Sequence, residues 1–165
     1  MREQIRITVP GGLRAEIDAI RERFNPELVR NNPAHATIVY HDELADPALL
    51  RERLAAAVAE TEPFELEVGG ARRFRQATGA YLAVTDPTGA VERLRRAILA
   101  PPSTPRTRLM LHVTLLHPAF GHRLAEAWPA FEPLRFDRRF RVEGLELMSG
   151  SREGLSTSSH PFRAG

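Results

Sequence analysis

Two strand-like segments with the same layout recur in this chain: HATIVY, which begins at His35, and HVTLLH, which begins at His112. In each segment a threonine follows the histidine by two residues, and apolar residues alternate with the polar ones. Side chains at positions i and i+2 of a β-strand project to the same face. His35 and Thr37 should therefore stand side by side, as should His112 and Thr114, while the apolar residues of each strand fill a core.

The similarity extends beyond the two segments. Each is followed by a helical pattern and then by a second strand that begins with phenylalanine. Phe64 follows His35 by 29 residues, and Phe140 follows His112 by 28 residues. Two β–α–β units of similar length predict a pseudo-two-fold arrangement. The first residues of the two units, the histidines, are then expected to face each other across a cleft.

The rest of the sequence alternates between strand and helix patterns. Hydrophobic periodicity predicts strands at 5–10, 35–40, 64–70, 80–85, 109–117 and 140–149. It predicts helices at 13–24, 47–60, 87–100 and 121–128. Loops are expected at 25–34 and 71–79, a Pro-rich connector at 101–108, and a tail to Gly165 that is either one more edge strand or loose. This mixture predicts an α+β fold with antiparallel sheets backed by helices.

Composition limits the class of protein. With 165 residues, 42% of them hydrophobic, the chain is expected to form a single domain over residues 1–165, with two lobes that share one core. Cysteine is absent, which excludes a disulfide framework, a thiol nucleophile and a thiolate metal site. No stretch resembles a signal peptide or a membrane-spanning helix, so a cytoplasmic protein without membrane contact is expected.

Every basic residue is arginine, and no lysine occurs. Arginine keeps its proton to very high pH and binds phosphate oxygens through a planar fork of N–H groups. A genome rich in Arg, Ala and Pro codons explains this usage more readily than selection for phosphate binding does. The net charge of +2 therefore does not by itself indicate a nucleic-acid-binding protein.

Two imidazoles on opposite walls of one groove form a general acid–base pair. Imidazole titrates near neutral pH, so one ring can take a proton from a nucleophile while the other gives a proton to a leaving group. This division of roles suits cleavage of a phosphodiester, above all a strained cyclic one. The hydroxyls of Thr37 and Thr114 can donate hydrogen bonds to the non-bridging phosphate oxygens, where negative charge develops. Neither a metal nor a cofactor is required.

With these motifs the chain resembles the 2H phosphoesterase superfamily, also called the LigT-like or 2′-5′ RNA ligase family. Its two His-x-Thr/Ser-x motifs match residues 35–38 and 112–115. FELEVGGARRF followed by AYLAV resembles the segment between the motifs, and FRVEGLELMS resembles the closing strand. The resemblance implies a bilobal fold of two pseudo-symmetric lobes, each an antiparallel sheet with helices outside, around a central groove.

The resemblance also implies an activity. Family members act on 2′,3′-cyclic phosphates at RNA ends or on related cyclic or 2′-5′ phosphodiesters. His112 would activate water as the base and His35 would protonate the departing 3′ oxygen, which leaves a 2′-phosphate. The near-symmetry of the motifs permits either order. The expected partner is an RNA 3′ end or a small cyclic nucleotide, and no second protein is needed, so a monomer is expected. Short loops and the absence of lysine leave binding of a long RNA open.

Each candidate residue also has a purely structural interpretation. A single strand histidine is usually hydrogen-bonded in a core, and threonine is an ordinary strand former; the repeated context favours catalysis. The remaining histidines do not show the spacing of metal ligands, so no metal site is expected. Arg108 precedes His112 by four residues and would share its face if the strand began early, where it could reach the phosphate. A solvated arginine fits equally well there.

Two further alternatives concern the basic segment and the activity. Segment 71–79 places arginines around Phe74, an arrangement that can hold a single-stranded end, although a surface loop with a buried ring is favoured. The same groove could serve a binding module that recognises RNA ends or nucleotides with little turnover. It could also serve a reversible 2′-5′ RNA ligase, which uses the same residues in the reverse direction.

Overall fold

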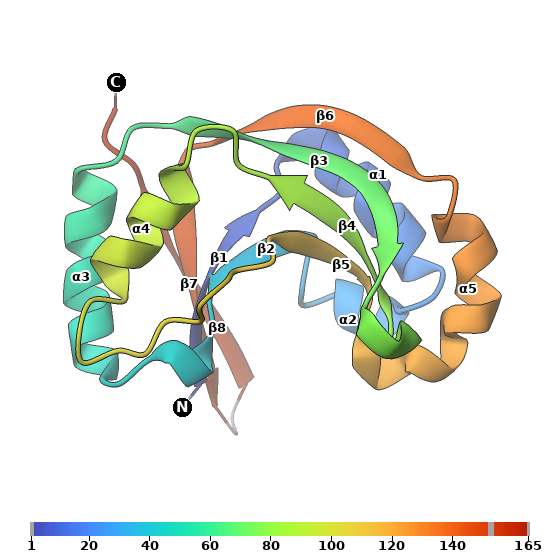
Figure 1. The fold of residues 1–165 in the computed structure, drawn as a ribbon, viewed down its shortest axis with the longest axis horizontal. Helices are drawn as coiled ribbons and strands as arrows, with labels where there is room; N and C mark the ends of the chain where they lie inside the picture. Colours follow the sequence, from blue (N-terminus) through green and yellow to red (C-terminus); the bar gives the residue numbers. More distant parts are fainter. Residues whose placement is uncertain (1, 152–153, 165) are drawn as a thin grey trace.

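A computed structural model of the protein describes residues 2–151 and 154–164. Within these ranges the chain forms two four-stranded sheets, in which every pairing is antiparallel. Sheet 1 has the order β2-β1-β7-β8 and sheet 2 the order β5-β4-β3-β6. Figure 1 shows the two sheets meeting along β2 and β5, with helices on the outside. The predicted bilobal α+β fold is confirmed.

The strands are bounded as follows: β1 (Arg2–Thr8), β2 (His35–Val39), β3 (Phe64–Arg73), β4 (Ala80–Thr85), β5 (His112–Leu116), β6 (Arg135–Val142), β7 (Gly144–Ser151) and β8 (Gly154–Pro161). The helices are α1 (Gly11–Glu22), α2 (Pro26–Val29), α3 (Pro47–Ala59), α4 (Ala90–Ile98) and α5 (Leu124–Phe131). Short 3₁₀ helices follow β2 (η1, His41–Glu43), β3 (η2, Arg75–Ala77) and β5 (η3, Pro118–Arg123).

A pseudo-two-fold relation is visible in the order of the elements, but its units are not the predicted ones that start at His35 and His112. Those units are not equivalent, because β2 and β3 lie in different sheets whereas β5 and β6 lie in the same sheet. In sheet 1, β1 leads through α1 to the edge strand β2, which pairs with β1. In sheet 2, β4 leads through α4 to the edge strand β5, which pairs with β4. Each of these helices packs against the edge strand of the other sheet: α1 contacts β5, and α4 contacts β2. The buried apolar residues of both sheets consequently form one core.

Several predicted boundaries are wrong, and the largest error concerns the expected strand 140–149. The chain leaves sheet 2 at Val142 and enters sheet 1 at Gly144, so this stretch belongs to two strands, β6 and β7. At Gly144 a β-carbon would lie 2.7 Å from the carbonyl oxygen of His160, closer than side chains allow. The crossing therefore depends on glycine, because β8 passes directly against the backbone there.

Other differences are smaller. The strand expected at 109–117 begins only at His112, since the connector extends to residue 111. The loop expected at 25–34 contains α2, and the basic loop at 71–79 is partly strand, because β3 continues to Arg73. The helix expected at 121–128 is shifted into η3 and α5. The tail forms the edge strand β8; residues 152–153 and Gly165 lie outside the described residues.

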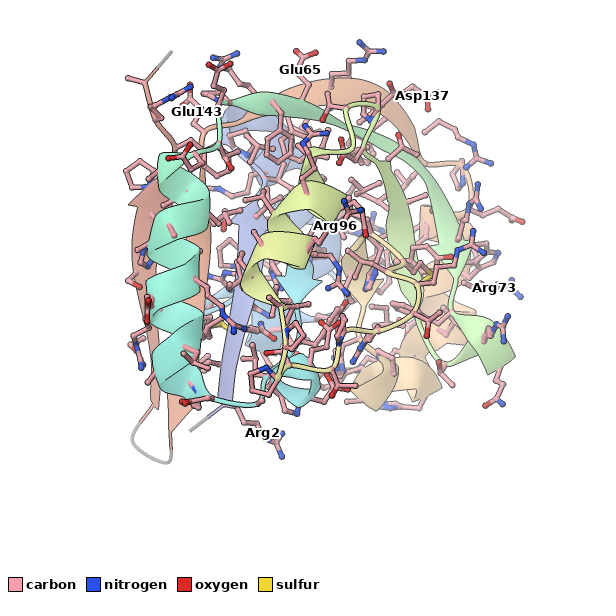
Figure 2. All side chains as sticks on the ribbon, turned by 60° about the vertical axis from the view of Figure 1, so that its left-hand side comes forward. Arg2, Glu65, Arg73, Arg96, Asp137 and Glu143 are labelled. Atoms are coloured by element: carbon pink, nitrogen blue, oxygen red, sulfur yellow. The ribbon has the colours of Figure 1, made fainter. Side chains whose placement is uncertain are left out.

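Charged side chains of both signs project from the outer surface. Glu65 on β3, Asp137 on β6 and Arg96 on α4 are examples (Figure 2). Some of these charges are paired, as where Arg139 of β6 contacts Glu67 of β3 at 3.2 Å. Among the described residues, no helix has the combined length and apolar character that crossing a membrane would require.

Candidate active site

A groove of about 460 Å³ lies between the two sheets. The candidate residues from both motifs line it, and so does Arg108 from the connector. The structure thus brings together His35, Thr37, His112, Thr114 and Arg108, which come from widely separated parts of the sequence. The other lining residues are Gln4, Arg21, Leu28, Asn32, Tyr40, Phe74, Arg106, Leu109, Met110, His117 and Pro118.

Strand alternation directs the motif side chains into the groove. On β2, Ala36 and Ile38 are completely buried, whereas the histidine and threonine of the motif are partly exposed. On β5, Val113 and Leu115 are buried in the same way. The apolar positions of each motif therefore anchor its strand in the core, and the intervening positions face the groove.

The two imidazole rings are oriented by the same local contact. His35 Nδ1 lies 2.7 Å from the carbonyl oxygen of Pro33, and His112 Nδ1 lies 2.8 Å from that of Met110. A carbonyl oxygen can only accept a hydrogen bond, so Nδ1 must carry the proton in both rings. Nε2 is then the nitrogen that can take up or release a proton, and no protein group among the described residues hydrogen-bonds it in either ring.

Burial favours the neutral form of both rings. It lowers the pKa of His35 to about 4, and the positive charges of Arg6 and Arg21 add to this effect, while the bond to the carbonyl of Pro33 opposes it. Burial also lowers the pKa of His112, by a smaller amount. A bound anion would favour the protonated form of a nearby ring, so protonation of this pair is expected to depend on the substrate.

The two threonine hydroxyls are available for a ligand. Neither Thr37 nor Thr114 forms a side-chain hydrogen bond with another protein group in the described part of the chain. Both side chains are partly exposed to the groove. Each hydroxyl can therefore donate its hydrogen bond to an oxygen atom of a bound anion.

An aromatic wall flanks His112. The ring of Phe74 meets the imidazole edge-on at 5.2 Å between centroids, and Tyr81 does so at 5.5 Å. Tyr81 lies beside Thr114 in the register of β4 and β5. Phe74 is therefore a groove residue rather than the buried anchor of a surface loop. Tyr81 could have been anticipated only from the pairing of β4 with β5, which the sequence did not reveal.

The arginines near the groove differ in how they are held. The guanidinium of Arg106 stacks on the ring of Tyr40 at 3.8 Å and binds both oxygens of Asp42 at 3.0 and 2.9 Å. The strand does not begin early enough to include Arg108, and this residue lines the groove from the connector instead. Its guanidinium has no ion pair or hydrogen bond within residues 2–151 and 154–164, which leaves it available to an anion.

The buried Glu43 fixes the connector over the groove. Its carboxylate accepts hydrogen bonds from Arg95 Nη2 at 2.7 Å and from the backbone N–H of Arg106 at 2.7 Å. The backbone carbonyl oxygen of Glu43 accepts a hydrogen bond from the backbone N–H of Thr104 at 3.0 Å. Burial raises the pKa of Glu43, but the bonds from Arg95 and the backbone outweigh this and lower it overall. Nothing in the sequence distinguished Glu43 from a surface residue.

Two further residues of interest differ in position. His117 reaches the groove, and its Nδ1 accepts a hydrogen bond from the backbone N–H of Ala119 at 3.1 Å. The guanidinium of Arg73, from the basic segment, lies 4.3 Å from the centre of the Trp128 ring instead of in the groove. No group of three His, Asp or Glu side chains within the described ranges is arranged as a metal site.

Comparisons with known proteins identify a family and similar folds. The 2′-5′ RNA ligase superfamily matches residues 9–154. Escherichia coli LigT complexed with NADP⁺ has a similar fold, with a TM-score of 0.62 and 16% identity over 99% of this chain and 98% of that one. The protein TT0787 of Thermus thermophilus gives 0.61 and 16% over 96% and 94%.

A third solved structure, described as a phosphoesterase, gives a TM-score of 0.61 and 19% identity over 98% of this chain and 95% of that one. At these identities the similar structures bear on the fold alone. A comparison with curated proteins gave no match. The superfamily match covers most of the sequence and includes both motifs. The chain therefore belongs to the 2′-5′ RNA ligase superfamily, within the 2H phosphoesterases.

Proposed function

We propose that the protein is a metal-independent cyclic phosphodiesterase that hydrolyses 2′,3′-cyclic phosphates to 2′-phosphates. One observation carries the proposal: two imidazoles from unrelated parts of the chain line one groove in the same tautomer. Beside each ring stands a threonine hydroxyl, and neither Nε2 nor hydroxyl is bonded to a protein group within the described ranges. A structural role for either histidine would not require this duplication. Superfamily membership supports the proposal.

In the proposed reaction, Nε2 of one ring removes a proton from water as the water oxygen attacks phosphorus. Nε2 of the other ring gives a proton to the 3′ oxygen as the bond from phosphorus to that oxygen breaks. The product carries a 2′-phosphate and a 3′-hydroxyl. Thr37 and Thr114 donate hydrogen bonds to the non-bridging oxygens, and Arg108 neutralises part of their charge.

Different observations support the two possible assignments of acid and base to His35 and His112. The family resemblance implies that His112 is the base and His35 the acid. The protein's own groups favour the reverse, because the pKa of His35 is lowered further than that of His112. A bound phosphate would raise the pKa of both rings, so the order depends on which ring lies nearer to the anion.

A substrate with a good leaving group can show which histidine is the acid and which is the base. A p-nitrophenyl phosphodiester needs no protonation of its leaving oxygen, so loss of the acid should matter little and loss of the base should still abolish turnover. If His112 is the base, His35→Ala will cleave this ester nearly as fast as the unchanged protein, and His112→Ala will not. The opposite result would reverse the assignment.

The nature of the substrate rests on analogy. E. coli LigT has been crystallised with 3′-AMP, ATP and phosphate, so a similar fold can hold nucleotides. In this chain the groove combines the two threonine hydroxyls, the guanidinium of Arg108 and the aromatic ring of Phe74. Such a lining fits a phosphate joined to a nucleoside, whether a mononucleotide or the 3′ end of an RNA.

The central experiment measures hydrolysis of a 2′,3′-cyclic nucleotide by phosphorus NMR in the presence of EDTA. The expected product is the 2′-phosphate alone. His35→Ala and His112→Ala should each slow turnover by about 10²–10⁴-fold, as loss of a positioned acid or base typically does. His122→Ala is the matched control, because this exposed histidine lies outside the groove. Full activity in both groove variants would refute the proposal.

Two other activities are distinguished by the same assay. The superfamily's description makes reversible 2′-5′ ligation a second candidate, and it is detected by joining of RNA half-molecules that end in a cyclic phosphate and a 5′-hydroxyl. A binding module would hold the 2′-phosphate or the cyclic ester tightly without turnover of any member of a panel of cyclic phosphates.

A further inference from the structure

Helix α1 holds the short segment that precedes motif 1. Asp18 Oδ1 accepts a hydrogen bond from the backbone N–H of Ala34 at 2.9 Å. Arg21 Nη1 donates to the carbonyl oxygen of Asn32 at 3.0 Å and also to Asp18 Oδ1 at 2.6 Å. One ion pair on one face of a helix thus binds the chain on both sides of Pro33.

Pro33 is the residue whose carbonyl oxygen orients the ring of His35. The carbonyl of Pro33 and the N–H of Ala34 belong to one planar peptide unit. The bond from this N–H to Asp18 therefore fixes the plane of the carbonyl directly, and the bond from Arg21 holds the preceding peptide unit at Asn32. A further bond, from Arg6 Nη1 to Asn32 Oδ1 at 2.7 Å, fixes the same segment from β1.

Burial makes this arrangement rigid. The side chain of Arg21 is 3% exposed and that of Asp18 is 18% exposed. A buried ion pair with several hydrogen bonds has few alternative geometries. The corresponding carbonyl for His112 belongs instead to Met110, which lies in the connector and is 47% exposed. The two histidines therefore share a tautomer, but the carbonyl that orients His35 is held by buried side chains and the carbonyl that orients His112 lies in an exposed segment.

We propose that Asp18 and Arg21 are a positioning pair for His35, which fixes its Nδ1–H tautomer and the direction of Nε2 by holding the carbonyl of Pro33. In this role the pair acts through the segment 32–34, although Arg21 also lines the groove. This inference rests on the proposed function, because the orientation of His35 matters for turnover only if that ring transfers a proton.

The charge of Arg21 has a separate effect that the test must remove. The charged or titratable groups that act on His35 are Arg6 from β1, Arg21 from α1 and His112 from β5. Arg6 and Arg21 are themselves paired with Glu146 and Asp18. Both bonds of Arg21 come from Nη1. Arg21→Lys keeps the positive charge on a shorter side chain, whose ammonium falls short of the position of Nη1, so it isolates geometry from charge.

The first readout is independent of substrate. In protein labelled with ¹⁵N in its histidine rings, NMR should show Nδ1 protonated and Nε2 unprotonated for His35 at pH 7. In Asp18→Ala and Arg21→Lys, the signals of His35 should move toward a mixture of tautomers, while those of His112 stay unchanged. Glu16→Gln is the control, since it removes an exposed ion pair to Arg138 from the same helix.

The second readout is turnover. Asp18→Ala and Arg21→Lys should lower kcat by about 10- to 100-fold with little change in KM, because a misdirected ring affects the reacting step more than binding. In the His35→Ala background the same substitutions should have no further effect. A circular dichroism spectrum and melting curve close to those of the unchanged protein identify variants that fold, and Arg21→Lys is the mildest of them.

The outcomes separate this inference from the proposed function. If the tautomer of His35 persists in both variants, the positioning pair is refuted, whatever the activity. If the tautomer is lost and kcat is unaffected, the inference is likewise overturned. If the tautomer is lost but no cyclic phosphate is turned over even by the unchanged protein, the proposed function fails and the structural role of the pair stands.

Discussion

At the residue scale, the site depends on relations between residues that lie two positions apart in the sequence. The alternation of β2 and β5 places a histidine and a threonine on one face, and a carbonyl two residues upstream sets the tautomer of each ring. The first of these is a property of any strand, which explains why His35, Thr37, His112 and Thr114 could be chosen from the sequence. The second depends on backbone direction before the strand and could not.

The threonine hydroxyls give a prediction at this scale. Thr37→Val and Thr114→Val keep the shape and the strand preference of the side chain but remove the donor to the phosphate. Each should lower kcat/KM about tenfold or more, since one hydrogen bond to a charged oxygen contributes about 1.5–3 kcal/mol. Steady-state kinetics on a cyclic nucleotide measure the loss. Thr85→Val, at an exposed position of β4 outside the groove, is the control; an equal loss there would contradict the assignment.

At the scale of elements, the connector between α4 and β5 is the part that the sequence described least well. Its Pro-rich composition predicted irregular structure correctly, but not that Glu43 would bind it at Thr104 and Arg106. Glu43 and Arg106 are 63 positions apart, and no local pattern encodes such a pairing. Arg108 illustrates the same point, because the connector, and not an early start of the strand, brings it to the groove.

Removing the charge of Glu43 should therefore affect stability and the site together. Glu43→Gln leaves the buried Arg95 without its partner, and such losses typically cost about 3–5 kcal/mol. The midpoint of urea unfolding should fall accordingly, and KM should rise because the connector carries Arg108. Asp42→Asn is a matched control, since its ion pair with Arg106 is exposed and is expected to contribute less than about 1 kcal/mol. Equal midpoints for both variants would contradict this account.

At the scale of the whole molecule, strand and helix types followed from periodicity, whereas the partners of each strand did not. The stretch 140–149 shows why: it has a continuous strand pattern, yet the chain changes sheets at Glu143. Which sheet a strand joins is decided by packing against residues distant in the sequence. The packing of α1 against β5 and of α4 against β2 likewise depends on residues that are distant in the sequence.

Stability of the whole molecule should depend on the titration of His35. Its pKa is about 4 in the folded protein and 6.5 when unperturbed, so between these values the unfolded chain binds more protons than the folded one. Stability is then fully present above pH 6.5 and is lost as the pH falls toward 4, by about 2 kcal/mol at pH 5.

Urea unfolding at pH 7.5 and pH 5 measures this loss. His35→Gln cannot titrate and should show a smaller decrease between the two pH values than the unchanged protein. The lowered pKa of Glu43 adds a loss only at more acidic pH, so it does not obscure the comparison. Identical decreases in the two proteins would show that burial of His35 does not govern the acid sensitivity.

The reciprocal seating of α1 on β5 and of α4 on β2 has a consequence for how the protein selects what it binds. A hinge motion of one lobe relative to the other would break the contacts of α1 with β5 and of α4 with β2. We therefore expect the distance between the two imidazoles to change little when a ligand binds. Discrimination between ligands should then come from how well they fit, with almost no induced closure.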